Sequence, residues 1–161
     1  MNRIFAVTTA LTLLAVMPAF GREQHADKNK PVVRRVFTEI LSQGKFEITG
    51  QIYASDFVNH DTTQDLALDQ SQGIDRGWRS AFPDLEMTVE KEIAEGDLVT
   101  VLWRGRGTNT GVGNGLNATG KKVDGRGISI FRVVNGQIKE EWTEYSGLLI
   151  LRQMGLFPAH P

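Results

Sequence analysis

The chain has 161 residues, which fits one domain, and carries a formal net charge of −1 at pH 7 with no cysteine. A chain this close to neutral, with no basic surplus, argues against a nucleic-acid partner. The lack of cysteine excludes disulfides and thiolate metal sites, but it does not fix the cellular compartment.

Residues 1–21 have the three parts of a secretory signal peptide. Arg3 gives a positive start, Ile4–Val16 is apolar apart from threonines, and Ala19-Phe20-Gly21 places small residues at the −3 and −1 positions. We therefore expect cleavage near Gly21 and a secreted or periplasmic protein. The alternative is a buried or membrane-anchoring helix.

After this segment, residues 22–29 are polar and predict a disordered leader, because they have little apolar surface to bury. No later apolar run approaches the length of a membrane span, so no membrane contact is expected after cleavage. The folded domain is expected over residues 30–161.

The first half of this domain has helical periodicity. Apolar residues from Val32 to Leu41 recur on one stripe after Pro31, and Gly44 ends that helix. A shorter helix is predicted over 46–53, a non-helical segment over 56–61, a loop or weak helix over 62–72, and a third helix over 73–82 with Ile74, Trp78 and Phe82 on one face.

After Pro83 the period changes to two, which is typical of strands. Asn135-Gly136 is a strong signal for a two-residue hairpin turn. Strands are predicted over 85–93, 99–104, 121–134 and 137–145, followed by a closing helix over 148–154. Helices followed by an antiparallel meander indicate an α+β domain, with a pocket between the helices and a bent sheet.

The last strand offers a candidate acid–base group. If the strand alternates regularly, Glu140, Trp142 and Glu144 share the face of the apolar Ile138, together with Ser146. Burial beside Trp142 would raise the pKa of Glu144, as a general acid–base requires. The alternative is that the strand twists at its end and leaves Glu144 in solvent.

His60 is the second candidate, because the other two histidines lie near the chain ends. An imidazole can move protons near neutral pH, and the position of His60 suits a pocket rim. An equally good interpretation is that His60 ties down the loop beside Asn59 and Asp61. No second histidine lies at ligand spacing, so no metal site is expected.

Several runs in order along the chain resemble the SnoaL-like polyketide cyclases, also called ester cyclases, of the NTF2-like superfamily. The likeness covers about residues 30 to 158, through the runs FVNHD at 57–61, AFPDL at 81–85, IAEGDLV at 93–99, RGTNTG at 106–111, GISIFR at 127–132, GQIKEEW at 136–142 and LRQMG at 151–155.

This resemblance implies an NTF2-like cone, in which a curved antiparallel sheet wraps around N-terminal helices and encloses a pocket. It also implies a homodimer, and ring closure by aldol condensation without metal or organic cofactor. The family's acid–base residue is an aspartate four positions after the tryptophan of the last strand. Here that position is Ser146, four after Trp142.

Two functions follow as alternatives. One is proton transfer on a polyketide-like carbonyl compound, with Glu144 as the acid–base and His60 orienting the carbonyl. The other is binding of a small apolar molecule without turnover. For either, the expected lining residues are Trp103, Trp142, Tyr53, Trp78, Asn59 and Ser146.

Overall fold

The computed structural model describes residues 27–158. The predicted signal peptide at 1–21 and most of the predicted leader lie outside the described residues. Within 27–158, no helix combines the length and the apolar character needed to cross a membrane.

The described chain contains helical segments, most of them before the main strands, and six strands. The helical segments are α2 (Lys30–Arg35), the π-helix η1 (Val36–Leu41), the 3-10 turn η2 (Phe46–Ile48), α3 (Thr49–Ile52), α4 (Leu68–Ala81) and α5 (Gly147–Gln153). The strands are β1 (Tyr53–His60), β2 (Asp65–Ala67), β3 (Glu86–Glu95), β4 (Leu98–Thr108), β5 (Lys122–Val134) and β6 (Gln137–Tyr145).

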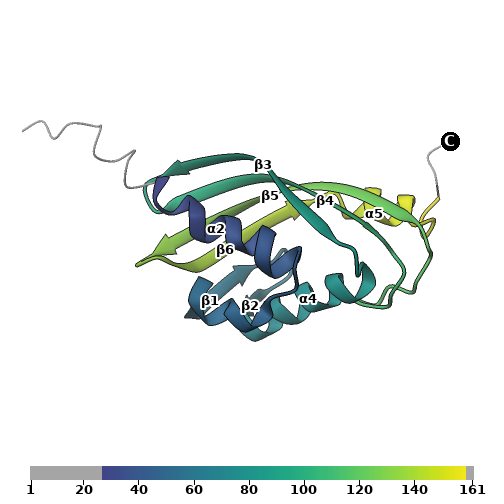
Figure 1. Ribbon diagram of the computed structural model, residues 1–161, viewed down its shortest axis with the longest axis horizontal. Coiled ribbons are helices and arrows are strands. Elements are labelled where there is room, and N and C mark those ends of the chain that lie inside the picture. The colour runs from purple at the N-terminus through teal and green to yellow at the C-terminus, as the bar shows by residue number, and fades with distance from the viewer. Residues whose placement is uncertain (1–26, 159–161) are drawn as a thin grey trace, which may run out of the picture.

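The six strands form one curved sheet in the order β2-β1-β6-β5-β4-β3 (Figure 1). The predicted α+β, NTF2-like architecture is confirmed. The sheet is mixed rather than wholly antiparallel, because β1 runs parallel to β6.

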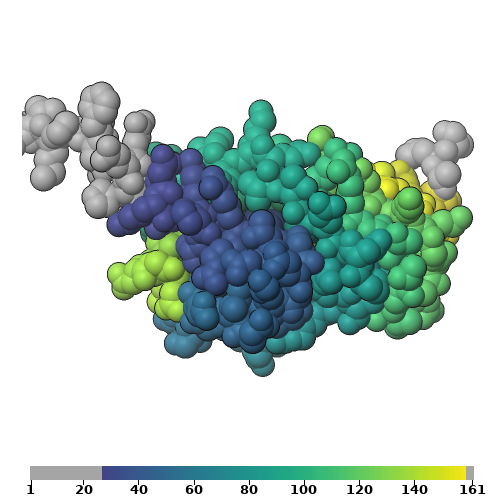
Figure 2. Space-filling view, in the orientation of Figure 1, coloured from purple at the N-terminus to yellow at the C-terminus, as the bar shows by residue number. Residues whose placement is uncertain are grey.

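Helices cover one face of this sheet. Figure 1 shows α2 and α4 in front of the strands and α5 at the far end, and in Figure 2 the chain from α2 to α4 covers much of this face. η1 packs against β3, and α4 packs against β1. The main apolar cluster between the layers includes Phe37, Ile40, Val101, Phe131 and Ile138, all nearly or fully buried. Burial of this surface is the main stabilising term of the fold.

The chain between the first and third helices differs from its prediction. The segment predicted as helix over 46–53 is only the short η2 and α3, and the segment predicted as non-helical over 56–61 falls mostly within β1. β1 forms because β6 offers it a strand to pair with, and such a non-local partner leaves no local signature. The helix predicted over 73–82 begins earlier, at Leu68, where the Gln70 side chain accepts a hydrogen bond from the Ala67 N–H.

The hairpin between β5 and β6 is as predicted. Asn135 and Gly136 both have positive φ, 52° and 80°, as a two-residue turn of the hairpin type requires. Next to this turn, Val134 pairs with Gln137 and Val133 pairs with Ile138.

The residues of β6 that face the helices are not the predicted ones. Arg132 pairs with Glu140 rather than with Lys139, so β6 carries one extra residue, a β-bulge, at this point. Beyond the bulge the alternation is shifted by one, and Glu141 rather than Glu140 lies opposite the buried Phe131. Glu140, Trp142 and Glu144 therefore belong to the outer face, and the predicted inward direction of Glu144 is wrong.

Charge pairing gives a physical reason for the bulge. Regular pairing from the turn would place Arg132 opposite Lys139, and like charges opposite each other are unfavourable. In the bulged register the Arg132 Nε donates to Glu140 Oε2 at 2.5 Å, and Lys139 Nζ reaches Asp56 on β1. Both cations thus gain an acidic partner.

The outer face of the sheet has an apolar centre, which we call the outer patch. It consists of Leu102, Ile128, Ile130 and Trp142, which are cross-strand neighbours. Ile128 is 49% exposed. The charges around the patch are already paired within the chain, as Arg104 with Asp124, Arg126 with Glu90, and Arg132 with Glu140 and Asp97. A partner surface can cover an apolar centre inside a rim of paired charges without leaving a buried charge unpaired.

We propose that a second copy of the chain covers the outer patch. Ile128→Lys should then convert a dimer into a monomer, because it places a charge at the centre of the interface. Light scattering at micromolar concentration measures the change. Val112→Lys, in an exposed loop position between β4 and β5, is the matched control and should remain dimeric. A monomeric parent protein would contradict the proposal.

Candidate functional site

A cavity of about 150 Å³ lies between the helices and the inner face of the sheet. Its walls include Phe37 and Trp103 from the main apolar cluster and Phe82 and Val123 from a second cluster at the α5 end. The cavity thus marks the gap between the two clusters, where the helical layer and the sheet are not in direct contact.

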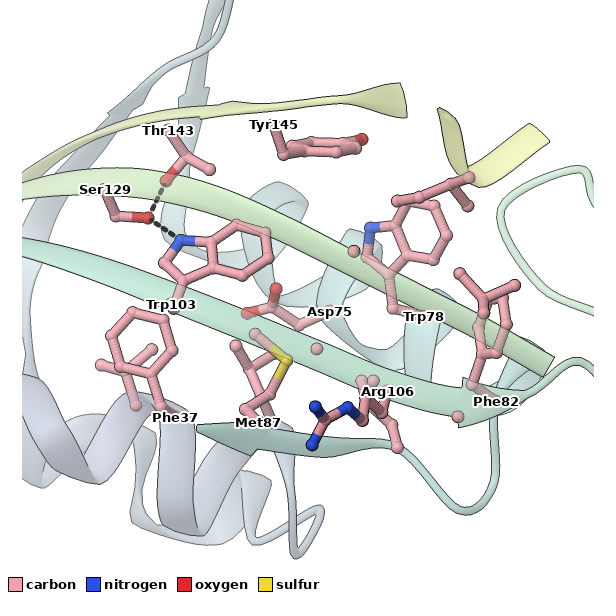
Figure 3. A pocket seen from close by; sticks show the side chains of 18 of the residues that line it. Phe37, Asp75, Trp78, Phe82, Met87, Trp103, Arg106, Ser129, Thr143 and Tyr145 are labelled. Carbon is pink, nitrogen blue, oxygen red and sulfur yellow. Dashed lines mark hydrogen bonds between the residues drawn. The ribbon is translucent and has the colours of Figure 1, made fainter. Parts of the chain in front are cut away.

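Aromatic rings form much of the wall (Figure 3). Tyr145 contacts both tryptophans, with ring centroids 6.2 Å from Trp78 and 6.3 Å from Trp103. Phe82 lies beside Trp78 at 6.0 Å, and Phe37 lies beside Trp103 at 6.5 Å. These contacts join rings from η1, α4, β4 and β6 into one apolar surface.

Two carboxyl groups are placed in this apolar surface. Asp75 comes from α4 and Glu141 from β6, and both line the cavity. Figure 3 shows the Asp75 carboxyl group in the space between Trp103 and Trp78. Because burial penalises the charged form, carboxyl groups in such a place hold their protons to a higher pH than usual.

The electrostatics of the pair follow from this burial. Burial, and then the nearby charge of Glu141, raise the pKa of Asp75 to about 8. Burial raises the pKa of Glu141 to about 7, and a hydrogen bond from Thr143 opposes that rise. Near neutral pH the pair therefore combines a protonated carboxyl with one that is partly ionised. Because the two titrate together, these values describe the pair.

A chain of hydrogen bonds favours the ionised form of Glu141. The Trp103 Nε1–H, which can only donate, donates to Ser129 Oγ at 2.9 Å. Ser129 Oγ lies 2.6 Å from Thr143 Oγ1, and Thr143 Oγ1 donates to Glu141 Oε1 at 2.8 Å. With Trp103 at its start, every hydroxyl can point its hydrogen toward the carboxylate, so the chain stabilises negative charge at its end.

Asp75 is held from the other side of the cavity. The Gln72 Nε2 donates to Asp75 Oδ2 at 3.3 Å, and Thr49 Oγ1 donates to Gln72 Oε1 at 3.0 Å. Gln72 is only 2% exposed, so this amide is fixed by its surroundings. Of the two carboxyl groups, Asp75 accepts the longer hydrogen bond and has the higher pKa. Asp75 is therefore the better suited to be the proton donor.

Gly127 makes room for the Trp103 indole. A Cβ atom at this position would lie 2.2 Å from Trp103 Cζ2 and 2.7 Å from the Glu144 carbonyl oxygen. Only glycine lets the indole lie across β5 and reach Ser129. Gly127 is thus required by the site.

The structure brings together three of the residues expected at the pocket. Trp103 reaches it from β4, Trp78 from α4 and Tyr53 from the start of β1. Tyr53 is buried, and burial together with the charges of Glu141 and Asp75 raises the pKa of its hydroxyl well above the usual value. Tyr53 is therefore neutral.

The other expected residues do not line the cavity. Glu144 is exposed on the outer face because of the bulge in β6. His60 stacks on Trp142 on that same face, with ring centroids 4.6 Å apart, and its Nδ1 lies 2.9 Å from Asp65 Oδ1. The interpretation of His60 as a tie for its loop agrees with this geometry better than a place at the pocket rim.

Asn59 and Ser146 have local partners instead. Asn59 Nδ2 donates to Ser71 Oγ at 3.1 Å and so joins β1 to α4. Ser146 is exposed at the N-cap of α5, where its carbonyl oxygen accepts from the Leu149 N–H.

Sequence reasoning missed both carboxyls of the cavity. For Asp75 a signal was present, because Asp75, Trp78 and Phe82 follow helical spacing and all three line the cavity, whereas Ile74 is 41% exposed. Of the predicted stripe, Trp78 and Phe82 line the cavity, and Asp75 takes the place of Ile74. For Glu141 the only signal in the sequence is that regular pairing from the hairpin turn would place Arg132 opposite Lys139. This repulsion predicts a shift of one residue in the register between β5 and β6.

The arrangement can donate a proton and accept a proton within one apolar space. Such a pair is suited to enolisation, in which a carbon loses a proton while the carbonyl oxygen gains one. Within residues 27–158, no three histidine, aspartate or glutamate side chains are grouped so as to hold a metal ion.

Comparisons with known proteins agree with the resemblance seen in the sequence. The sequence profile of the SnoaL-like polyketide cyclases matches residues 31–154. No curated protein matches the chain. Among solved structures, AclR from Streptomyces galilaeus, assigned as a hydroxylase, has 21% identity and a TM-score of 0.76 over 84% of this chain and 90% of its own.

Two further solved structures carry the family's name or activity. An assigned SnoaL-like polyketide cyclase from Jannaschia sp. CCS1 has 24% identity and a TM-score of 0.75, over 83% of this chain and 95% of its own. IdmH from Streptomyces antibioticus, assigned as a polyketide cyclase, has 25% identity and a TM-score of 0.70, over 80% of this chain and 99% of its own.

The hydrogen-bond chain to Glu141 leads to a testable prediction. Thr143→Val removes the last donor, and since that bond lowers the pKa of Glu141, the pKa should rise above about 7. A hydrogen bond to a charged group contributes about 1.5–3 kcal/mol. Carboxyl ¹³C NMR of protein labelled at glutamate measures the titration, and Glu141→Gln assigns the signal. Thr143→Ser keeps the hydroxyl and should leave the titration near that of the parent; equal curves for Val and Ser would contradict the prediction.

Proposed function

The chain belongs to the SnoaL-like polyketide cyclase family, and from this premise we propose that its cavity catalyses acid–base proton transfer on a carbonyl compound, in an aldol-type cyclisation or an isomerisation. The observation that carries the proposal is the pair of partly buried carboxyls that line one apolar cavity, with pKa values of about 8 for Asp75 and about 7 for Glu141. Groups that titrate near the working pH are the most effective acid–base catalysts.

In the proposed reaction, the ionised Glu141 takes a proton from the carbon next to the carbonyl group. Protonated Asp75 donates its proton to the carbonyl oxygen as charge develops there, which gives an enol. In a cyclisation the enol carbon then attacks a second carbonyl carbon of the same molecule, and its former carbonyl oxygen returns the proton to Asp75. Protonated Glu141 supplies the proton for the new alkoxide, so both groups return to their starting states.

The rest of the site supports these two roles. The hydrogen-bond chain from Trp103 stabilises the charged Glu141, and Gln72 orients Asp75. The aromatic walls give the enol an apolar surrounding.

The proposal also accounts for Ser146. The family resemblance implies an aspartate at that position, and this chain has an exposed serine at the start of α5. The acid–base role, which the sequence suggested for Glu144, is assigned here to Asp75 and Glu141.

The test follows deuterium exchange at the carbon next to the carbonyl group of uncharged ketones in D₂O by NMR. Glu141→Gln should lower the enzymatic rate by about 10²–10⁴-fold, and Asp75→Asn should lower it to a comparable extent. The rate should rise as Glu141 loses its proton near pH 7 and fall as Asp75 loses its proton near pH 8, giving a narrow bell.

Glu144→Gln is the matched control, because Glu144 is a carboxylate of the same strand on the opposite face. It should leave the exchange rate unchanged. If the parent protein binds such ketones and exchanges none of their hydrogens, the proposal is wrong and the alternative function, binding without turnover, replaces it.

We further propose that the protein is exported and cleaved near Gly21. The support is the sequence pattern of residues 1–21, with Arg3 before the apolar run and small residues before the cleavage position. Mass spectrometry of the protein from its native host should give a chain that begins at Arg22. An intact Met1 in a cytosolic fraction would contradict export.

A further inference from the structure

The size of the cavity limits what it can hold. Its volume is about 150 Å³, and an engineered protein cavity of about this volume, lined by aliphatic and aromatic side chains, binds benzene. We propose that the site takes an uncharged carbonyl compound that carries a single aromatic ring, with the ring held between Trp78 and Trp103. This inference rests on the proposed function for its carbonyl group, whereas the size and charge limits stand on the cavity alone.

Two walls of the cavity, Trp103 and Trp78, are held by specific contacts. Trp103 is 9% exposed, donates to Ser129 and lies against Gly127, which leaves it no room to move toward β5. Trp78 packs edge-on against Tyr145, with an interplanar angle of 86°, and beside Phe82. Widening the cavity at Trp103 would break the Trp103–Ser129 hydrogen bond, and a buried indole N–H left without a partner is costly.

The charges around the cavity exclude anions. Asp75 and Glu141 both face the space, so an anionic ligand would add a negative charge in an apolar surrounding. Arg106 also lines the cavity, but its Nε lies 3.2 Å from Asp124 Oδ2 and its side chain is 54% exposed. Its charge is therefore already countered at the surface of the sheet, and the cavity favours an uncharged ligand.

The three tryptophans allow a direct test on the full chain. Each indole N–H gives its own ¹⁵N NMR signal, and Trp→Phe variants assign them. Trp78 and Trp103 line the cavity, whereas Trp142 lies on the outer face beside His60 and serves as an internal control. The probes are acetophenone, which is a one-ring ketone, benzoate, which has the same ring with a charge, and 9-fluorenone, which is a three-ring ketone.

Acetophenone should shift the signals of Trp78 and Trp103 and leave Trp142 in place. Benzoate and 9-fluorenone should each bind at least about tenfold more weakly, a difference of about 1.4 kcal/mol. Trp78→Ala widens the space and should remove the preference for acetophenone over 9-fluorenone, while the Trp103 signal reports that the variant is folded. Binding of 9-fluorenone or benzoate as tightly as acetophenone, or a shift confined to Trp142, would overturn the inference.

The same samples separate this inference from the proposed function. Deuterium exchange at the methyl group of acetophenone reports proton transfer, and the indole signals report binding. Selective binding without exchange supports the ligand class and contradicts the catalytic proposal. Acetophenone exchange that is as fast in Glu141→Gln as in the parent protein would show that catalysis takes place elsewhere.

Discussion

The site depends on the ion pair between Arg132 and Glu140, which holds β6 in a register shifted by one residue. This pairing places Lys139 in a bulge and turns Glu141, Thr143 and Tyr145 toward the cavity. Since successive side chains of a strand point to opposite faces, a shift of one residue exchanges the whole set. Without the bulge, Glu140 and Trp142 would face inward, and neither the hydrogen-bond chain nor the contact of Tyr145 with both tryptophans would exist.

Placing two carboxyls in an aromatic cavity opposes folding, because each must lose water or keep its proton. The protein reduces this cost without removing it. Thr143, Ser129 and Trp103 stabilise charge on Glu141, and Gln72 provides a polar partner for Asp75. The hydrogen bond to Glu141 is shorter than the one to Asp75, which suits Glu141 to be the base and Asp75 to be the acid. The stability of the domain comes instead from the main apolar cluster, where Phe37, Phe131 and Ile138 are fully or almost fully buried.

The two faces of the sheet have separate chemistry, which the tryptophans illustrate. Trp103 faces inward, donates a hydrogen bond at the start of the chain to Glu141, and forms a wall of the cavity. Trp142 faces outward, stacks on His60 and belongs to the outer patch. The charged side chains around that patch form ion pairs with one another. The carboxyl groups of Asp75 and Glu141, which form no ion pair within residues 27–158, lie on the inner side of the sheet.

The sequence by itself determined the fold class, the helix at Pro31, the four long strands and the turn at Asn135-Gly136, because each rests on local periodicity or on backbone preferences of single residues. It also determined that Trp78, Trp103 and Tyr53 belong to one apolar interior. Only the tertiary structure decided that 53–60 is a strand, since it needs β6 as a partner, and that Glu141 rather than Glu144 enters the cavity. Both outcomes depend on pairing between distant segments: a strand takes its register from its neighbour, and the charge on Arg132 selects Glu140 over Lys139 only once the two strands lie side by side.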